Sequence, residues 1–402
     1  MQTLILKNDL YWNGILDPNL RVFDIIMKTE FGTTYNSYIL VGSEKTALFE
    51  TAKAKFTDEY IEYFERIKKF SEIDYIIVNH TEPDHSGSIE KILDLNPNIT
   101  IVGTQTAISF LKKIVNREFK SIIAKDNDIL SLGNKTLLFM QLPNLHWPDT
   151  MFTYVKEDEL LFTCDAFGAH YSFEGVLRSS LPIEKTADYK KAFAQYFYDI
   201  IYPFRKPFML NALHRLEGFA ISMILTGHGP VIDSHIDEVM KSYTEWTLAE
   251  NPNTKKTVII PYVSAYGYTK EIGENIKNGI KASGDIDVRM YDMVDSNLDF
   301  VIKEIEFADG ILFGSPTFLG DALSPIWDLL SRMNYVVNKG KLAAAFGSYG
   351  WSGEAVANLT ERMKQIRLNV IDGLRIKFKP NDEDKKNAYD FGYNFGSQLI
   401  KK

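Results

Sequence analysis

The sequence predicts an α/β protein of two domains. The first is a pair of β-sheets packed inside helical layers, and the second is a doubly wound parallel sheet of five strands. The chain has 402 residues, more than one ordinary core holds. The polar segment AENPNTKKT (249–257) has the composition of a linker, and strand and helix patterns alternate regularly only after it. We therefore predict domains at residues 1–250 and 256–402.

Composition narrows the class of protein. Hydrophobic residues make up 45% and charged residues 24%, as in ordinary globular proteins. A net charge of -8 with no basic block disfavours nucleic acids and anionic membranes as partners. The start lacks a signal-peptide pattern and no run of about 18 apolar residues occurs, so we expect a cytoplasmic protein. The single cysteine, Cys164, excludes an internal disulfide and a cysteine-ligated iron–sulfur or rubredoxin-type centre within one chain.

The N-terminal half mixes strands with interspersed helices. A helical pattern covers 56–70, and a second, amphipathic one covers 235–250 before the linker. Strand-like segments are expected at 3–12, 34–42, 45–51 and 74–80, with strand pairs at 120–132, 135–143 and 151–165. This mixture predicts two sheets between helical layers.

The C-terminal half repeats a strand and a helix. Strands are expected at 257–263, 287–293, 310–316, 341–347 and 374–380, with helices at 269–283, 323–334, 353–366 and the C-terminus. Repeated βα units of this length predict an open, doubly wound parallel sheet.

The segment HTEPDHSG directly follows the apolar run DYIIV and concentrates potential metal ligands. In an extended loop, residues i and i+2 point the same way, so His80 and Glu82 can reach one centre. Asp84 and His85 follow Pro83, which fixes the backbone, and they can face a second centre. Two imidazoles and two carboxylates in six positions favour metal binding over a packing role.

Three further candidate ligands also lie in loops beyond apolar strands. They are His146 in QLPNLHWPD, Asp165 in LLFTCDAFG and His228 in ILTGHGP. Taken singly, a histidine or aspartate at a strand end is more often a turn or capping residue than a ligand. Four of the seven histidines occupy such loops, however, which favours one common site.

Three loops after predicted strands of the C-terminal half are candidates for a phosphate-containing, flat ligand. SAYGYT precedes a helix, whose N-terminal amides attract phosphate. The other two loops, SPTFLGDALSP and GSYGWSGEA, combine glycines with aromatic rings at the strand ends where doubly wound sheets bind ligands. The candidate cofactor-binding residues are Ser264, Ala265, Tyr266, Gly267, Tyr268, Thr269, Pro316, Thr317, Phe318, Leu319, Gly320, Ser348, Tyr349, Gly350, Trp351 and Gly353.

The first of these loops is a weak predictor alone, because similar turns often only cap a helix. Neither GxGxxG nor GxxxxGK[ST] occurs, which disfavours dinucleotide and nucleoside triphosphate binding. The same strand and loop layout without a cofactor is found in response-regulator-like domains, which remain an alternative.

The HxExDH pattern with its later partners resembles the metallo-β-lactamase superfamily, whose usual pattern is HxHxDH. The three C-terminal loops resemble flavodoxins, which bind FMN. Together the two halves resemble the flavodiiron proteins (A-type flavoproteins) over nearly the whole chain. The resemblance implies an αββα metallo-β-lactamase-like sandwich followed by a flavodoxin-like domain. Glu82 stands where the superfamily has a histidine, and a carboxylate-rich donor set suits iron better than zinc.

The expected centre is therefore a pair of iron ions. His80, Glu82 and His146 are expected on one ion. Asp84, His85 and His228 are expected on the other, and Asp165 is expected to bridge the two. Trp147 matches the family and is expected near the flavin-facing side of the centre. Tyr171 and His170 follow Asp165 closely and could lie near the gas pocket, but we expect them to be ordinary loop residues.

The resemblance implies an oxidoreductase that passes electrons through FMN to the irons. The irons would reduce O2 to water, NO to N2O, or both, and the metal ligands are the same for the two gases. No rubredoxin or flavin-reductase module is visible, so a separate donor is expected: rubredoxin, a flavin reductase or reduced F420. The family also implies a head-to-tail homodimer, which can assemble into a tetramer.

Two other functions remain open from the sequence. One is a zinc hydrolase with a flavodoxin-like accessory domain, which would turn over an ester, thioester or lactam without electrons. The other is a non-enzymatic electron-transfer or redox-sensing flavoprotein with a vestigial metal site. Metal content and gas consumption distinguish both from a flavodiiron enzyme.

Overall fold

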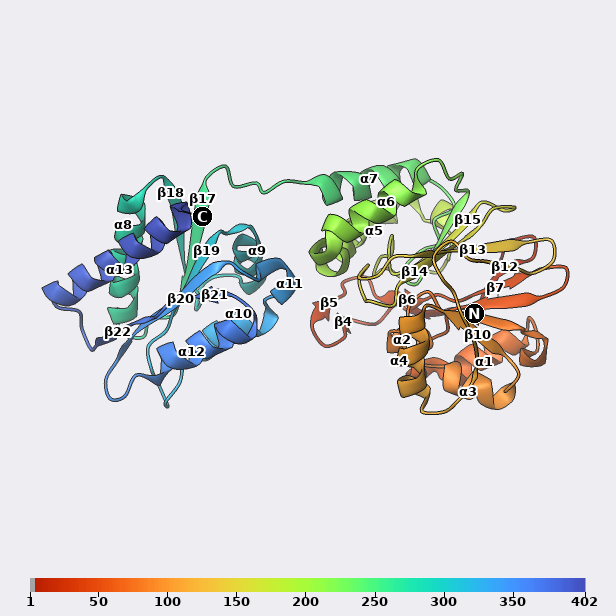
Figure 1. The fold of residues 1–402 in the computed structure, drawn as a ribbon, viewed down its shortest axis with the longest axis horizontal. Coiled ribbons are helices and arrows are strands. Elements are labelled where there is room, and N and C mark those ends of the chain that lie inside the picture. The colour runs from red at the N-terminus through yellow and green to blue at the C-terminus, as the bar shows by residue number, and fades with distance from the viewer. Residues whose placement is uncertain (1–3, 402) are drawn as a thin grey trace. The chain divides into compact units, whose positions relative to one another are not determined.

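The computed structural model describes residues 4–401 and divides the chain into two compact units, Met1–Ala249 and Glu250–Lys402 (Figure 1). No helix among the described residues is long and apolar enough to cross a membrane.

The first sheet of the N-terminal unit has seven strands in the order β1-β2-β7-β8-β9-β10-β11. The strands are β1 (Leu4–Lys7), β2 (Leu10–Trp12), β7 (Tyr38–Val41), β8 (Thr46–Phe49), β9 (Tyr75–Ile77), β10 (Thr100–Gly103) and β11 (Lys120–Ile123). Strands from β8 to β11 run parallel, and the others are antiparallel. The predicted strand at 3–12 is a hairpin, because the chain turns between β1 and β2.

The second sheet has five strands in the order β12-β13-β14-β15-β16. They are β12 (Ile129–Ser131), β13 (Thr136–Gln141), β14 (Met151–Val155), β15 (Leu160–Cys164) and β16 (Met223–Thr226). The expected pair within 151–165 is the β14–β15 hairpin. The expected pair within 120–132 is wrong, because β11 ends one sheet and β12 begins the other.

The two sheets face each other across one core. Phe49 of the first sheet stacks on Phe162 of the second with ring centroids 3.7 Å apart. Trp12, Leu40, Leu137 and other apolar side chains of both sheets fill the same buried cluster. Apolar residues on these inner faces explain why two sheets form rather than one.

Helices cover both outer faces of this sandwich. Helices α1 (Thr57–Glu65), α3 (Ile89–Leu95) and α4 (Gln105–Val115) pack on the first sheet. Helices α5 (Thr186–Tyr196), α6 (Leu210–Leu216) and α7 (Ile236–Leu248) lie beside the second sheet (Figure 1). There Tyr243 of α7 contacts Phe167, which contacts Phe152 of β14. The unit is an αββα sandwich, as the sequence predicts.

Smaller elements complete the unit. The ribbon β3 (Ile15–Asp17) pairs with β6 (Thr33–Tyr35), and the hairpin β4 (Val22–Phe23) pairs with β5 (Met27–Lys28). The one-turn helix α2 (Pro83–Ser86) follows β9. Gly87 after it has an ordinary negative φ of -63°. Its missing side chain matters for space, because a Cβ would lie 2.5 Å from the Ala54 nitrogen and the Pro83 oxygen.

The C-terminal unit is a parallel sheet in the order β18-β17-β19-β20-β21, with β22 also paired to β20. The strands are β17 (Lys256–Tyr262), β18 (Ile286–Asp292), β19 (Gly310–Gly314), β20 (Leu342–Tyr349), β21 (Asn369–Val370) and β22 (Leu374–Lys377). The predicted fifth strand at 374–380 is the shorter β22, and the short β21, which was not predicted, precedes it and pairs with the other end of β20. The order is that of flavodoxin, with its switch point between β17 and β19.

Helices lie on both faces of this sheet. Helices α8 (Tyr268–Ser283) and α13 (Asp382–Ile400) share one buried cluster with the sheet. Helices α9 (Leu298–Phe307), α10 (Ser324–Arg332) and α12 (Glu354–Gln365) share the other, and α11 (Tyr335–Asn338) is a single turn. Helix α9 was not among the predicted helices, although Val301 and Ile305 mark its buried face at helical spacing.

Candidate metal centre and flavin site

The structure brings all seven predicted metal ligands together in the N-terminal unit. His80 follows β9, and Glu82, Asp84 and His85 lie at or within the α2 turn. Asp165 follows β15, His228 follows β16, and His146 lies in the connection between β13 and β14. Ligand atoms within 4.8 Å of one another form two main groups, His80–Glu82–His146–Asp165 and Asp84–His85–His228.

Asp165 lies between the two groups and presents one carboxylate oxygen to each. Its Oδ2 is 2.8 Å from His146 Nε2 and 3.5 Å from His80 Nε2. Its Oδ1 is 3.0 Å from His85 Nε2 and 3.5 Å from His228 Nε2. A carboxylate with its oxygens divided in this way can bridge two cations.

Each group also has its own carboxylate. Glu82 Oε2 lies 3.1 Å from His80 Nε2 and 3.4 Å from His146 Nε2. Asp84 Oδ2 lies 3.1 Å from His228 Nε2 and 3.5 Å from His85 Nε2. Both Asp84 oxygens are buried without a hydrogen-bond donor among the described residues. A buried carboxylate surrounded by imidazoles rather than by amide or hydroxyl donors fits a cation ligand, because its charge needs compensation.

The two groups differ in exposure. The side chains of Asp84, His85 and His228 are at most 4% exposed, whereas Glu82 and His146 are 19% and 16% exposed. The centre is therefore closed on one side and reaches solvent on the side of Glu82 and His146.

Charge coupling shifts the pKa values of these groups in opposite directions. Burial alone would raise the pKa of Asp84, but the His85 and His228 imidazoles hold it below its ordinary value. Burial alone would lower the pKa of His85, but Asp84 and Asp165 raise it to about 9. Without metal, His85 thus carries a proton at neutral pH that a bound cation would displace.

Several residues that support the centre were not found from the sequence. The buried Asp149 carboxylate contacts His80 Nδ1 and accepts hydrogen bonds from Thr81. Glu50 is also buried, which raises its pKa to about 7, and it accepts a hydrogen bond from the Asn79 amide. Asp149 lies in the segment QLPNLHWPD, but its role depends on its contact with His80, which is 69 residues earlier in the chain.

His170 belongs to the surroundings of the centre, so the expectation of an ordinary loop residue was wrong. Its ring lies 5.2 Å from that of His228 and 4.8 Å from that of Tyr196. Burial, followed by the nearby His228, lowers the His170 pKa well below its ordinary value. Tyr171 instead contacts Phe31, Tyr189 and the Lys185 carbonyl.

The closed side of the centre is lined by close-packed atoms. Gly227, before His228, has no room for a side chain. A Cβ there would lie 2.6 Å from His85 Cε1 and 3.2 Å from Cys164 Sγ. Burial and the nearby carboxylates of Glu50 and Asp165 raise the pKa of the Cys164 thiol, so it stays protonated beside the ligands. Trp147 contacts the His80 ring with centroids 5.0 Å apart.

In the C-terminal unit, the three predicted loops lie at the carboxyl ends of β17, β19 and β20. Ser348 and Tyr349 are the last two residues of β20 rather than loop residues. The buried Thr269 Oγ1 lies 2.9 Å from Ser348 Oγ and joins two of these segments. Tyr266 and Trp351 are 74% and 95% exposed, so flat apolar surface is available beside the loops.

These loops fit a flavin phosphate. Helix α8 has 16 residues and begins after Gly267. The Ser264 hydroxyl accepts a hydrogen bond from the Lys270 amide, and the other first-turn amides can face an anion. Gly267 and Gly320 have positive φ values of 84° and 74°, and a Cβ on either would meet no atom within 4 Å. The backbone there is open to close approach by a ligand.

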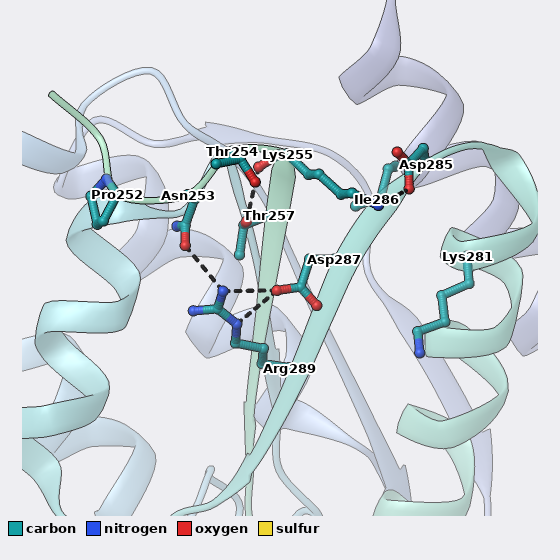
Figure 2. A pocket seen from close by; sticks show the side chains of 10 residues that line it. All are labelled: Pro252, Asn253, Thr254, Lys255, Thr257, Lys281, Asp285, Ile286, Asp287 and Arg289. Atoms are coloured by element: carbon teal, nitrogen blue, oxygen red, sulfur yellow. Dashed lines mark hydrogen bonds and ion pairs between the residues drawn. The ribbon is translucent and has the colours of Figure 1, made fainter.

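A second hollow lies at the opposite ends of β17 and β18 (Figure 2). The Arg289 guanidinium at its centre is already bonded to Asp287 and Asn253. Lys255 is paired with Asp285 at its rim. Arg289 and Lys255 are thus paired with carboxylates of the same hollow, and Lys281 also lines it.

Comparisons with known proteins agree with this arrangement. Residues 33–229 match the ODP family beta lactamase, and residues 260–392 match flavodoxin. The flavo-diiron protein FprA2 of Clostridium acetobutylicum is 38% identical over 99% of this chain and 100% of its own. The nitric oxide reductase of Moorella thermoacetica is 32% identical over 99% of both chains.

Solved structures show the same fold over the whole chain. The flavodiiron protein from Giardia intestinalis has a TM-score of 0.70 at 27% identity, covering 100% of this chain and 97% of its own. Rubredoxin oxygen:oxidoreductase from Desulfovibrio gigas has a TM-score of 0.73 at 24% identity, covering 100% and 99%. Because the chain is 38% identical to the flavo-diiron protein FprA2 over 99% of its length, it belongs to the flavodiiron proteins, a family of oxidoreductases with FMN and a non-haem diiron site.

Proposed function

We propose that the seven clustered side chains hold two iron ions. His80, Glu82 and His146 bind one ion, Asp84, His85 and His228 bind the other, and Asp165 bridges them. The observation that carries this assignment is the division of the Asp165 oxygens between the two groups. Four imidazoles and three carboxylates form a harder donor set than zinc hydrolases use, which favours iron.

The FMN would lie on the three loops of the C-terminal unit. The start of α8, with Ser264 and Thr269, would bind the phosphate. Residues 316–320 and 348–353 would flank the isoalloxazine ring with backbone amides and with the exposed aromatic side chains of Phe318 and Trp351.

The proposed reaction is the reduction of O2 to water. When bound, FMN supplies two electrons and the iron pair two more, which makes the four that O2 requires. The protein orients the four imidazoles, keeps Asp84 and Asp165 ionised, and excludes water from the closed side. Glu82 and His146 form the only solvent-exposed edge among the seven described ligand residues, so gas and electrons would arrive there.

Reduction of NO to N2O is a second candidate. It is favoured by the similarity to the Moorella thermoacetica protein, which is named a nitric oxide reductase. This reaction needs two electrons for two NO molecules and would use the same ligands. The electron donor would be a separate rubredoxin, a flavin reductase or reduced F420.

Metal analysis and two gas electrodes test this function. Purified protein should contain about two Fe per chain, as a two-metal site requires. After chemical reduction it should consume O2, NO or both, and the ratio of the rates ranks the two gases. A His146→Ala variant, which lacks one ligand, is the matched control and should consume neither. Stoichiometric zinc without iron, or FMN reduction with no gas consumption, would contradict the proposal.

A further inference from the structure

The two halves of the metal centre differ in the groups that contact the Nδ1 atoms of their histidines, on the side of each ring away from the centre. Asp149 is fully buried, and its Oδ1 and Oδ2 lie 3.3 and 3.4 Å from His80 Nδ1. The same Oδ2 accepts hydrogen bonds from the Thr81 amide and the Thr81 hydroxyl, both at 2.7 Å. Thr104 Oγ1 donates to the Asp149 carbonyl, which fixes the backbone.

In the other half, no described carboxylate is hydrogen-bonded to the Nδ1 atom of His85 or of His228. His228 Nδ1 lies 2.6 Å from the neutral Thr34 carbonyl and 3.4 Å from Thr33 Oγ1. His85 Nδ1 is buried and has no hydrogen-bond partner among the described residues. Among the four ligand imidazoles, that of His80 is the one with a carboxylate in contact with its Nδ1 in the described residues. Glu50 lies near His85 and His80, but burial raises its pKa to about 7, so it carries less negative charge than Asp149.

We propose that Asp149 is a positioning residue that makes the two metal positions unequal, so that the position at His80 holds its ion more tightly and favours its ferric state. The inference rests on the proposed diiron site, but it concerns metal affinity and valence rather than turnover.

The physical reason is the hydrogen bond at the far side of the ring. When an ion is bound, the ionised Asp149 would hold the single His80 proton on Nδ1, which leaves the lone pair of Nε2, beside Glu82 and Asp165, for the ion. The carboxylate also makes the imidazole more basic and adds negative charge near the ion. Added negative charge stabilises Fe3+ more than Fe2+.

The Asp149→Asn variant tests this directly. An asparagine keeps the shape of the side chain but has only one oxygen, which the two Thr81 donors already use. Its amide would face His80 as a donor and favour the wrong tautomer. We expect the variant to lose one of its two irons, with about 10- to 100-fold weaker affinity at that position.

The measurement is anaerobic titration of metal-free protein with Fe2+ alone against a competing chelator, followed by Mössbauer spectroscopy. Asp149→Asn should bind one ion normally and regain the second only at higher free Fe2+, which a misfolded protein would not do. The Mössbauer spectrum of the ion that remains should match that of the ion retained by a His80→Ala variant. In a half-oxidised sample of the unmodified protein, the ferric ion should be the one that His80→Ala removes.

Thr81→Val is the matched control. It removes one donor to the same carboxylate oxygen but leaves the charge and the contact with His80. We expect it to retain both irons with near-normal affinity. Two normal irons in Asp149→Asn, or equal loss of iron in Thr81→Val, would overturn the role of Asp149. Failure of both variants and the unmodified protein to bind iron would instead contradict the diiron site itself.

Discussion

At the scale of single residues, Glu82 distinguishes this centre from a zinc hydrolase. Its carboxylate lies within 3.4 Å of both His80 and His146 Nε2 on the exposed side of the centre. A histidine there would supply a neutral, softer donor and would remove one negative charge. With one carboxylate fewer and one imidazole more, the donor set would favour Zn2+ through its lower negative charge rather than through a change of geometry.

Replacement of Glu82 by histidine should therefore exchange the metal. We expect zinc occupancy to rise at the expense of iron, and gas reduction to fall by a factor of about 100 or more, while FMN stays bound. Metal analysis, the flavin spectrum and both gas electrodes measure these changes. Glu82→Asp, which keeps the charge, should retain iron. Unchanged O2 and NO turnover in Glu82→His would show that Glu82 is not a ligand.

The residues proposed as metal ligands could be predicted from the sequence, but the residues that contact those ligands could not. His80, Glu82, Asp84 and His85 are close in sequence, so local spacing shows that they can converge. Asp149 and His170 act through contacts with residues 69 and 137 positions away. Only the folded sandwich brings such pairs together, and no local pattern encodes them.

At the scale of elements, the ends of strands carry the chemistry of both units. The helix α2 that holds Asp84 and His85 has only four residues, and the sequence suggested a loop there. Pro83 at its first position explains the turn, since proline is pre-organised for the start of a helix. In the C-terminal unit, α8 begins beyond β17, as the sequence predicts, and the Ser264 hydroxyl accepts from the Lys270 amide in its first turn.

Removing the hydroxyls at that helix start should weaken FMN binding. A hydrogen bond to a charged group contributes about 1.5–3 kcal/mol, so Ser264→Ala with Thr269→Val should weaken FMN binding by at least about 10-fold. Flavin fluorescence during dilution or dialysis measures the loss. Thr257→Val, at the opposite end of β17, is the matched control and should keep FMN. Iron content should stay unchanged, because loss of iron would mean that the two units do not bind their cofactors independently.

At the scale of the whole molecule, the head-to-tail homodimer implied by the family stays a proposal. In such a dimer the FMN of one subunit would serve the irons of the other. Each subunit of a symmetric dimer contributes the same surfaces, so two defective chains can complement each other.

Mixed dimers test this arrangement. An iron-deficient His146→Ala chain and the FMN-deficient Ser264→Ala/Thr269→Val chain should each be weakly active alone. Co-expressed at equal levels, they should recover roughly a quarter of normal gas reduction, because half of the dimers are mixed and each has one working pair. Electrode assays on the unfractionated mixture measure this recovery, and after tandem-affinity purification of the mixed dimers alone it should rise to about half. No recovery in verified mixed dimers would place electron transfer within one chain.

The overall architecture was predictable because each unit has a simple pattern. Regular alternation after residue 256 specifies a doubly wound sheet, and the polar segment at 249–257 marks the change of pattern. The separation of β11 from β12 into different sheets was not predictable, because both are short and largely exposed. Their neighbours are chosen by long-range packing, which periodicity does not report.

Gly227 sets a limit on how this protein can evolve. Even a single methyl group there would overlap the His85 ring. A point mutation to alanine would thus disturb a metal ligand without changing its identity. At this position the available volume constrains substitution as strictly as ligand chemistry does at His228. Gly227 is therefore as much a part of the metal site as the histidine that follows it.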